Sequence, residues 1–379
     1  MERIVYLDNS ATTKPCLKSC EYINTALKEN WGNPSSLHTL GMNAEILVDT
    51  SREKIAKLLS CDKSEIFFTG SGTESNNTAI MSAVAKRNGL NKIITTKIEH
   101  PSVLKTAERL KDFGFEVVYL DCDNNGIVDL KQLENELNGK TALVSCMLVN
   151  NEIGSIEPIK EISKLIKEKS PYALLHCDAV QGFGKLPINP KAMGIDLLSA
   201  SGHKIHGPKG IGILYCKKGV HIKPFITGGG QERGLRSGTE SVPLIAGLMG
   251  AIEELPDLNR QLDIINDLNL YARELFINSG FIKINSPASA LPYILNISVE
   301  GYRSETLLHF LEQRNIFVSS GSACAKGEAS YVLTAVGIGK SRADSALRLS
   351  FSKENTKEDI DKTFEALKIA AKTLVHSKI

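Results

Sequence analysis

The stretch of this sequence that says most about its fold and chemistry is Ser201-Gly202-His203-Lys204-Ile205-His206-Gly207-Pro208-Lys209-Gly210. It places Lys204 between two histidines in a glycine-rich loop that follows an apolar run. Glycine lets the backbone approach a bound molecule closely because it has no Cβ. A lysine that forms a Schiff base needs close approach and desolvation, whereas an exposed surface lysine needs neither. The stretch therefore predicts a reactive lysine at the end of a buried strand.

Length and composition narrow the class of protein. The chain has 379 residues, which exceeds the size at which a single core stops growing and so predicts two domains. Its formal net charge of +2 creates no field that favours nucleic acid, so we expect small-molecule chemistry. The N-terminus lacks the apolar core of a signal peptide, and no window reaches the roughly 18 apolar residues of a membrane span. We therefore expect a cytoplasmic protein that contacts neither nucleic acid nor a membrane.

The region from about residue 50 to residue 230 alternates short apolar runs with amphipathic ones, which is typical of an α/β fold. Several runs are continuously apolar, as strands covered on both faces are. We therefore predict a mostly parallel central sheet flanked by helices. The predicted strands span residues 65–69, 92–95, 116–120, 142–148, 173–177, 197–200 and 211–215.

The C-terminal part has a different pattern, which predicts a smaller α+β domain. A helix predicted at 242–254 leads into this part, whose own predicted elements are a helix at 258–279, a strand at 293–299 and a final helix at 357–374. The predicted division is a large domain over 15–254 and a small domain made of 1–14 and 255–379.

The first predicted strand leads into Gly70-Ser71-Gly72-Thr73-Glu74, a glycine turn at the start of a helix. Such a turn aims backbone N–H groups and a hydroxyl at an anion, so it is a candidate phosphate cradle. It lacks the Gly-Lys-Ser/Thr ending of an NTPase loop and the third glycine of a dinucleotide fingerprint, which disfavours nucleotides. An ordinary capped helix stays open as the alternative.

Asp178 ends the apolar run at 173–177, and open α/β sheets bind ligands at the carboxyl ends of their strands. A carboxylate there can keep a pyridine nitrogen protonated, which makes a pyridoxal ring an electron sink. The alternative is an aspartate that caps the next helix.

His100 follows another predicted strand, where it can lie against an aromatic cofactor or move protons, although a lone loop histidine is more often structural. Asn150-Asn151-Glu152 follows the apolar run at 142–148, where amides indicate a turn or a site. Arg348 stands within an apolar alternation and needs an anionic partner, either a substrate carboxylate or a structural carboxylate. These residues leave both interpretations open.

The eight cysteines lack the paired two-residue spacing of a zinc site, so we predict no metal and free thiols in a reducing compartment. A metal hydrolase using His203 and His206 has the wrong ligand spacing. Cys324 stands in a run of small and polar residues, which predicts an exposed thiol, either a nucleophile or a bystander. The other seven are interpreted as small buried hydrophobic residues.

Taken together, these segments resemble the cysteine desulfurases of the nitrogen-fixation and iron–sulfur-assembly type, which are class V aminotransferase-like, fold-type I pyridoxal phosphate enzymes. The likeness runs essentially from end to end, and the order and spacing of its motifs make it specific. Further segments that carry it are Tyr6-Leu7-Asp8-Asn9-Ser10-Ala11-Thr12-Thr13, Gly32-Asn33-Pro34-Ser35-Ser36, Gly228-Gly229-Gly230-Gln231-Glu232-Arg233-Gly234 and Arg236-Ser237-Gly238-Thr239.

The resemblance implies a fold-type I enzyme that removes sulfur from L-cysteine, giving L-alanine and a persulfide on Cys324. It implies pyridoxal 5'-phosphate as cofactor, a homodimer, and delivery of sulfur to an acceptor protein such as an iron–sulfur scaffold or a tRNA-thiolation enzyme. It also implies that Lys204 holds the cofactor aldehyde, Asp178 pairs with the ring nitrogen and His100 stacks on the ring and acts in catalysis.

The remaining site residues follow from the same resemblance. Gln181 is expected to hydrogen-bond the ring hydroxyl, while Asn151 and Arg348 match positions that bind the substrate carboxylate or its surroundings. The expected phosphate ligands are Gly72, Thr73, Ser201 and His203, with Thr239 reaching the cofactor of the other subunit.

Two rivals share parts of this pattern. A selenocysteine lyase or a β-eliminating cysteine lyase has the same fold, but simple elimination needs no protein thiol such as Cys324. A non-catalytic sulfur-relay component is disfavoured because Lys204, Asp178, His100 and Arg348 are retained together. The five residues from Ala325 to Ala329 form a shorter loop after Cys324 than we expect of housekeeping members, which predicts a shorter reach for the persulfide.

Overall fold

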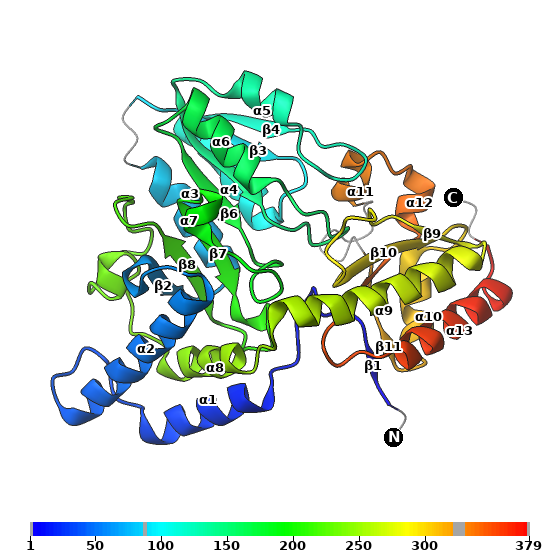
Figure 1. Cartoon of the computed structure of the whole chain (residues 1–379), viewed down its shortest axis with the longest axis horizontal. Coiled ribbons are helices and arrows are strands. Elements are labelled where there is room, and N and C mark those ends of the chain that lie inside the picture. Colours follow the sequence, from blue (N-terminus) through cyan, green and yellow to red (C-terminus); the bar gives the residue numbers. More distant parts are fainter. Residues whose placement is uncertain (1–2, 86–88, 321–329, 377–379) are drawn as a thin grey trace.

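The computed structural model describes residues 3–85, 89–320 and 330–376, and its largest feature is a seven-stranded sheet (Figure 1). The strand order is β2-β8-β7-β6-β5-β3-β4, and β8 alone runs antiparallel to its neighbours. The predicted mostly parallel sheet is confirmed. Its strands are β2 (Ile66–Thr69), β3 (Lys92–Thr96), β4 (Glu116–Leu120), β5 (Thr141–Met147), β6 (Leu174–Asp178), β7 (Leu197–Ser201) and β8 (Gly212–Cys216).

Both faces of this sheet are buried, which explains the continuous apolar runs. Successive residues of one strand enter two different cores: Leu143 and Val144 of β5 belong to separate clusters. Helices α3 (Gly72–Val84) and α4 (Pro101–Leu110) contribute to one core. The other core receives side chains from α2 (Thr39–Leu58), α5 (Leu130–Glu136), α6 (Ile159–Lys169) and α8 (Val242–Glu253).

The helices follow their sequence signals. In α6, Ile159, Ile162 and Ile166 recur at helical spacing and are all buried. Each predicted strand begins and ends within one residue of the observed one. At the start of β2, Glu65 belongs instead to a short 3₁₀ turn (Lys63–Glu65) whose cap, Asp62, exchanges hydrogen bonds with it in a capping box.

The C-terminal part forms a four-stranded antiparallel sheet in the order β12-β13-β10-β9. Its strands are β9 (Ile282–Ile284), β10 (Ile294–Val299), β12 (Ser319–Ser320) and β13 (Ala346–Ser350). Helices in this part of the chain are α9 (Leu258–Asn278), α10 (Ser304–Glu312), α11 (Tyr331–Ala335), α12 (Lys340–Asp344) and α13 (Lys357–Thr373). Helix α13 contacts both α9 and α10, and Figure 1 shows α9 and α13 running below this sheet.

The N-terminal segment returns to the C-terminal elements. Strand β1 (Val5–Tyr6) pairs in parallel with β11 (Ile316–Phe317), and Asp8 bridges to Ser350 at the end of β13. Helix α1 (Leu17–Glu29) then packs on α8 beside the large sheet. The segment before α1 therefore links the two sheets, while the domain boundaries at 15 and 254 stay a prediction. No helix among the described residues combines the length and apolarity that a bilayer crossing requires.

Candidate active site

Asp178 is the buried last residue of β6, at the edge where the parallel strands end. Its Oδ2 accepts a hydrogen bond of 2.7 Å from Asn76 Nδ2, and its Oδ1 accepts one of 3.0 Å from the backbone N–H of Val180. Asn76, on α3, also donates to Ser102 Oγ at 2.8 Å. A turn rather than a helix follows Asp178, so the helix-cap alternative is wrong. The carboxylate is held in one orientation from two sides.

His100 is the N-cap of α4, and Pro101 in the first turn fixes where that helix begins. Its Nδ1 accepts the backbone N–H of Ser102 at 3.2 Å and lies 2.8 Å from Ser102 Oγ. A neutral imidazole that accepts at Nδ1 carries its proton on Nε2. Burial lowers the pKa of His100, Asp178 opposes that shift and Lys204 adds to it. The ring is therefore neutral near pH 7 and lies within electrostatic reach of both residues.

Lys204 ends a short 3₁₀ turn (Gly202–Lys204) directly after β7. Its Nζ donates to the backbone carbonyls of Ser10 at 2.5 Å and Ala11 at 2.7 Å. The turn needs its glycine, because a Cβ on Gly202 would lie 2.8 Å from Ile211 Cγ2. Lys204, which follows a strand of the large sheet, is thus oriented by the N-terminal segment, the same segment that pairs with the C-terminal elements.

Gln181 lies in the turn after β6 and is buried. Its Nε2 donates to the same Ser10 carbonyl at 2.9 Å, and its Oε1 accepts from Lys185 Nζ at 3.1 Å. Two donors from different turns therefore converge on one carbonyl of the N-terminal segment.

The predicted phosphate cradle lies at the start of α3. Ser71 caps the helix by accepting the backbone N–H of Glu74 at 3.1 Å, as the capped-helix alternative requires. Gly72 is buried, and a Cβ there would lie 2.8 Å from Val180 Cγ2 and 3.4 Å from Ser201 Cβ. Ser201 Oγ is buried without a hydrogen-bond partner among the described residues. An unsatisfied hydroxyl beside a helix N-terminus is suited to an anionic oxygen.

Three further predicted phosphate ligands lie on less buried segments. His203 Nδ1 is 3.2 Å from Thr12 Oγ1, and burial, reinforced by nearby lysines, lowers its pKa to about 4. Thr73 and Thr239 are exposed. Thr239 lines a surface pocket together with Gly70, Gly210 and Arg236, and this pocket borders the turn that leads into α3.

Arg348 projects from the middle of β13 and is almost fully buried. Its Nη2 forms an ion pair with Asp8 Oδ1 at 2.9 Å, and its Nη1 donates to the backbone carbonyl of Asn151 at 2.8 Å. The structural ion pair is therefore present. Arg348 Nε and Asn151 Oδ1 are nevertheless buried without a partner among the described residues, so the group still offers hydrogen bonds to a small polar ligand.

Sequence reasoning missed several residues that shape this site. Asn76 and Ser102 support Asp178 and His100, and Lys185 supports Gln181. Asn76 gave one usable signal, since a polar residue one turn into a buried helix needs a polar partner. Cys324 lies outside the described residues. Cys20 is exposed and Cys61 and Cys122 are half-buried, so the interpretation of the seven other cysteines as buried is wrong for Cys20 and holds fully for only four of them. Among residues 3–85, 89–320 and 330–376, no cluster of His, Cys, Asp and Glu suited to a metal occurs.

Comparison with known proteins identifies the protein family to which this chain belongs. The aminotransferase class-V family model matches residues 5–363, so the chain belongs to that family. It is 44% identical over 377 residues to cysteine desulfurase IscS of Clostridium botulinum, covering 97% of this chain and 94% of the relative. Cysteine desulfurase IscS of Methanosarcina thermophila is 42% identical over 378 residues, covering 96% and 91%. Within its family, the chain therefore belongs to the cysteine desulfurases.

Solved structures agree with this assignment. A NifS-like protein superposes with a TM-score of 0.93 at 38% identity, covering 98% of this chain and all of the other. SspA in complex with cysteine superposes with a TM-score of 0.81 at 36% identity, covering 91% and 98%. The resemblance and the fold class inferred from the sequence are confirmed.

Proposed function

We propose that this chain uses pyridoxal 5'-phosphate to remove sulfur from L-cysteine, giving L-alanine and a persulfide on Cys324. The observation that carries the proposal is the convergence of Lys204, Asp178 and His100 at the carboxyl edge of the large sheet. The donor set fits the cofactor: an amine for its aldehyde, a buried carboxylate for its ring nitrogen, and a helix N-terminus with an unsatisfied hydroxyl for its phosphate.

Pyridoxal phosphate supplies an electron sink that stabilises negative charge on the substrate Cα. Asp178, fixed by Asn76 and the Val180 N–H, keeps a proton on the ring nitrogen. Lys204 would hold the cofactor aldehyde and, as a free amine, would take the proton from the substrate Cα. His100, neutral through burial, would accept the thiol proton of Cys324. The Cys324 thiolate then forms an S–S bond with the substrate sulfur while the substrate Cβ–S bond breaks, and the electron pair of that bond stays on Cβ, which is protonated as alanine is released.

The substrate carboxylate is assigned to the group formed by Arg348 and Asn151. The unpartnered Nε of Arg348 is a charged donor in a buried position, and such a donor is strongly stabilised by a carboxylate. Asp8 accepts a hydrogen bond from Nη2 of Arg348, so Nε remains as a donor for a second anion.

The active form is proposed to be a cytoplasmic homodimer in which Thr239 reaches the partner's cofactor. Two features support this assembly: Thr239 is exposed at the rim of a pocket, and exposed apolar side chains gather on α1, α2 and their connection. These side chains are Leu27, Trp31, Leu37, Met42 and Ile46. Light scattering on the purified protein tests the dimer, and a monomeric mass would contradict it.

Sulfur is proposed to pass from Cys324 to an acceptor protein, an iron–sulfur scaffold or a tRNA-thiolation enzyme. Incubation of the ³⁵S-labelled enzyme with each class of acceptor tests this step. Label that stays on the enzyme in both reactions would contradict the proposed delivery.

The test of the reaction is alanine formation from L-cysteine by the cofactor-loaded protein, with and without a reductant. Cys324→Ser is expected to keep the bound cofactor yet form no alanine, while Cys20→Ser, which changes the exposed cysteine on α1, keeps full activity. Pyruvate and ammonia in place of alanine would indicate β-elimination. Full turnover by Cys324→Ser would refute the nucleophile assignment.

A further inference from the structure

Lys185 is a buried lysine that the reaction outlined above does not use. It lies in the turn after β6, and only 5% of its surface is exposed. Its Nζ donates to Gln181 Oε1 at 3.1 Å and lies 5.6 Å from the ring centroid of Tyr293. Lysine is among the residues least often buried unless an anion pairs with it. Its position next to a site residue therefore requires an explanation.

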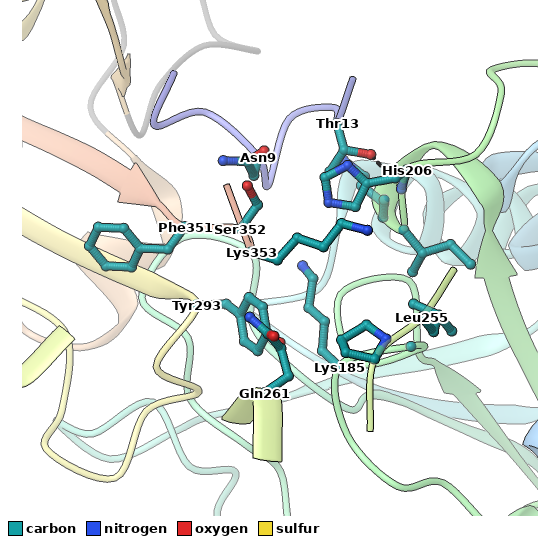
Figure 2. A pocket seen from close by; sticks show the side chains of 14 residues that line it. Asn9, Thr13, Lys185, His206, Leu255, Gln261, Tyr293, Phe351, Ser352 and Lys353 are labelled. Atoms are coloured by element: carbon teal, nitrogen blue, oxygen red, sulfur yellow. Dashed lines mark hydrogen bonds between the residues drawn. The ribbon is translucent and has the colours of Figure 1, made fainter. Parts of the chain in front are cut away.

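A continuous series of hydrogen bonds joins Lys185 to Lys204. Lys185 donates to Gln181 Oε1, Gln181 Nε2 donates to the Ser10 carbonyl, and the same carbonyl accepts from Lys204 Nζ. Both lysines also line one cavity, together with Lys353 and Tyr293. Figure 2 shows Lys185 and Lys353 extending into this cavity from different segments. The buried amine is thus coupled to the reactive one through a single amide and a single carbonyl.

We propose that Lys185 is a positioning residue that sets the orientation of the Gln181 amide toward the cofactor. An ammonium or amine hydrogen donates and a glutamine oxygen accepts, so the Oε1 side of the amide must face Lys185. The Nε2 side then faces Ser10 and Lys204, where it can donate to the ring hydroxyl of the cofactor. This inference rests on the proposed function, because the ring hydroxyl is the group that Gln181 would meet.

A purely structural role is disfavoured by the electrostatics. Burial, reinforced by the cations Lys204 and Arg348, lowers the pKa of Lys185 to about 7. The other polar side chains that line its cavity are Asn9, Thr13, Lys204, His206, Gln261, Tyr293, Ser352 and Lys353, and none of them is a carboxylate. A lysine with a depressed pKa in the folded state lowers the stability of the fold wherever it would be charged when unfolded. An apolar residue of similar length is therefore expected to fit this position without loss of stability.

The test compares Lys185→Met with the wild type, both loaded with pyridoxal phosphate. The pH midpoint of the absorbance change of the bound cofactor is expected to rise by about one unit, because the donor that orients the Gln181 amide toward the ring hydroxyl is lost. Release of the cofactor during dialysis is expected to be about 10-fold faster, as for the loss of one hydrogen bond. The melting temperature of the apoprotein is expected to stay equal or rise.

Lys353→Met is the matched control, because Lys353 lines the same cavity but lies near Glu254 rather than Gln181. The pH midpoint of the cofactor absorbance in this variant is expected to equal that of the wild type. In a Gln181→Ala background, Lys185→Met is expected to cause no further shift. Lys185→Arg, which keeps a charged donor, is expected to restore a midpoint close to the wild type and serves as the second variant if the methionine protein does not fold.

Three results would overturn the inference. They are an unchanged midpoint in Lys185→Met, an additional shift in the Gln181→Ala background, and an Arg variant no closer to the wild type than the Met variant. A wild-type protein that shows no cofactor band fails at the earlier step, the proposed function, and the inference falls with it. A failure confined to the Lys185 variants leaves the proposed function standing.

Discussion

Two parts of the active site are assembled in different ways. The sheet-edge group consists of Asp178, Asn76, Ser102 and His100, and it is built by β6, α3 and α4, which all belong to the large sheet and its helices. The bridging group consists of Asp8, Asn151, Arg348, Lys204 and the Ser10 and Ala11 carbonyls. Its hydrogen bonds join the N-terminal segment to β13, 340 positions away, and to the turn after β7.

The two groups of residues are suited to different tasks. The sheet-edge group is rigid because strand pairing and buried helix starts fix each member, so it suits a group whose charge must be held in place. The bridging group depends on the docking of the C-terminal elements, so its geometry changes whenever those elements move. We expect substitutions in the first group to act on turnover. In the second group, substitutions at Asp8, Asn151 and Arg348 are expected to act on substrate binding, whereas Lys204 serves turnover.

The largest effect is expected for Asp178→Asn in the sheet-edge group. An amide cannot hold the proton on a ring nitrogen as a carboxylate does, so kcat is expected to fall by roughly 10³-fold, as for the loss of a preorganised electrostatic contact. Rates of alanine formation measure this, with the absorbance of bound cofactor as a check on occupancy. A variant that keeps wild-type kcat would show that the carboxylate serves only the Val180 turn.

The second largest effect is expected for Arg348→Met in the bridging group. Loss of a charged donor from a buried position costs about 1.5–3 kcal/mol, so KM for cysteine is expected to rise about 10- to 100-fold with a smaller change in kcat. Arg3→Met is the matched control, because Arg3 pairs with Asp359 on α13 and lies away from Asn151. Equal KM values in both variants would remove Arg348 from the substrate site.

The comparison also shows how far the sequence alone leads. The positions of Asp178, Ser201 and Gly72 were predictable, because Asp178 and Ser201 end strands with clear apolar runs and Gly72 begins the helix after a third such strand. The ends of parallel strands meet at one edge of the sheet. The ion pair between Arg348 and Asp8 was not predictable, because no local sequence pattern indicates that the N-terminal segment pairs with the C-terminal elements. Local periodicity specifies strands and helices, whereas contacts across most of the chain depend on topology.

The sequence analysis also did not predict the residues that support the site through another side chain. Asn76 and Lys185 act through a second side chain, and the sequence carries no spacing signal that joins Asn76 to Asp178 or Lys185 to a carbonyl near the N-terminus. Their functions become visible only when donors and acceptors are matched atom by atom. The predicted exposure of the Cys324 thiol stays a prediction.

A smaller effect is expected for Asn76→Ala. The variant removes one of the two donors that hold the Asp178 carboxylate in place. We expect kcat/KM to fall by about 10-fold, the cost of one hydrogen bond to a charged group. Asn77→Ala, whose side chain contacts the Thr73 and Ser102 carbonyls and Thr106 Oγ1 but not Asp178, is expected to leave kcat/KM close to the wild-type value.

The smallest effect on turnover is expected for Glu152→Gln, beside the bridging group. Ser330 Oγ donates to Glu152 Oε2 at 2.5 Å, and burial raises the pKa of Glu152 to about 7, against the opposing effects of Ser330 and Arg348. Below about pH 4.5 the carboxyl is neutral in the folded and unfolded chains alike and makes no pH-dependent contribution. As the pH rises through 7, the unfolded chain has already ionised, so the folded state loses stability.

Glutamine stays neutral at every pH and keeps an oxygen that accepts from Ser330. The melting temperature of Glu152→Gln relative to the wild type is therefore expected to increase between pH 5 and pH 8, with a difference in the free energy of unfolding that reaches about 3 kcal/mol. Thermal melts of the two apoproteins across that range measure the trend. A difference that stays flat with pH would mean that Glu152 is ionised in the folded chain throughout, held by Arg348, and the bridging group would then carry a second buried anion beside Asp8.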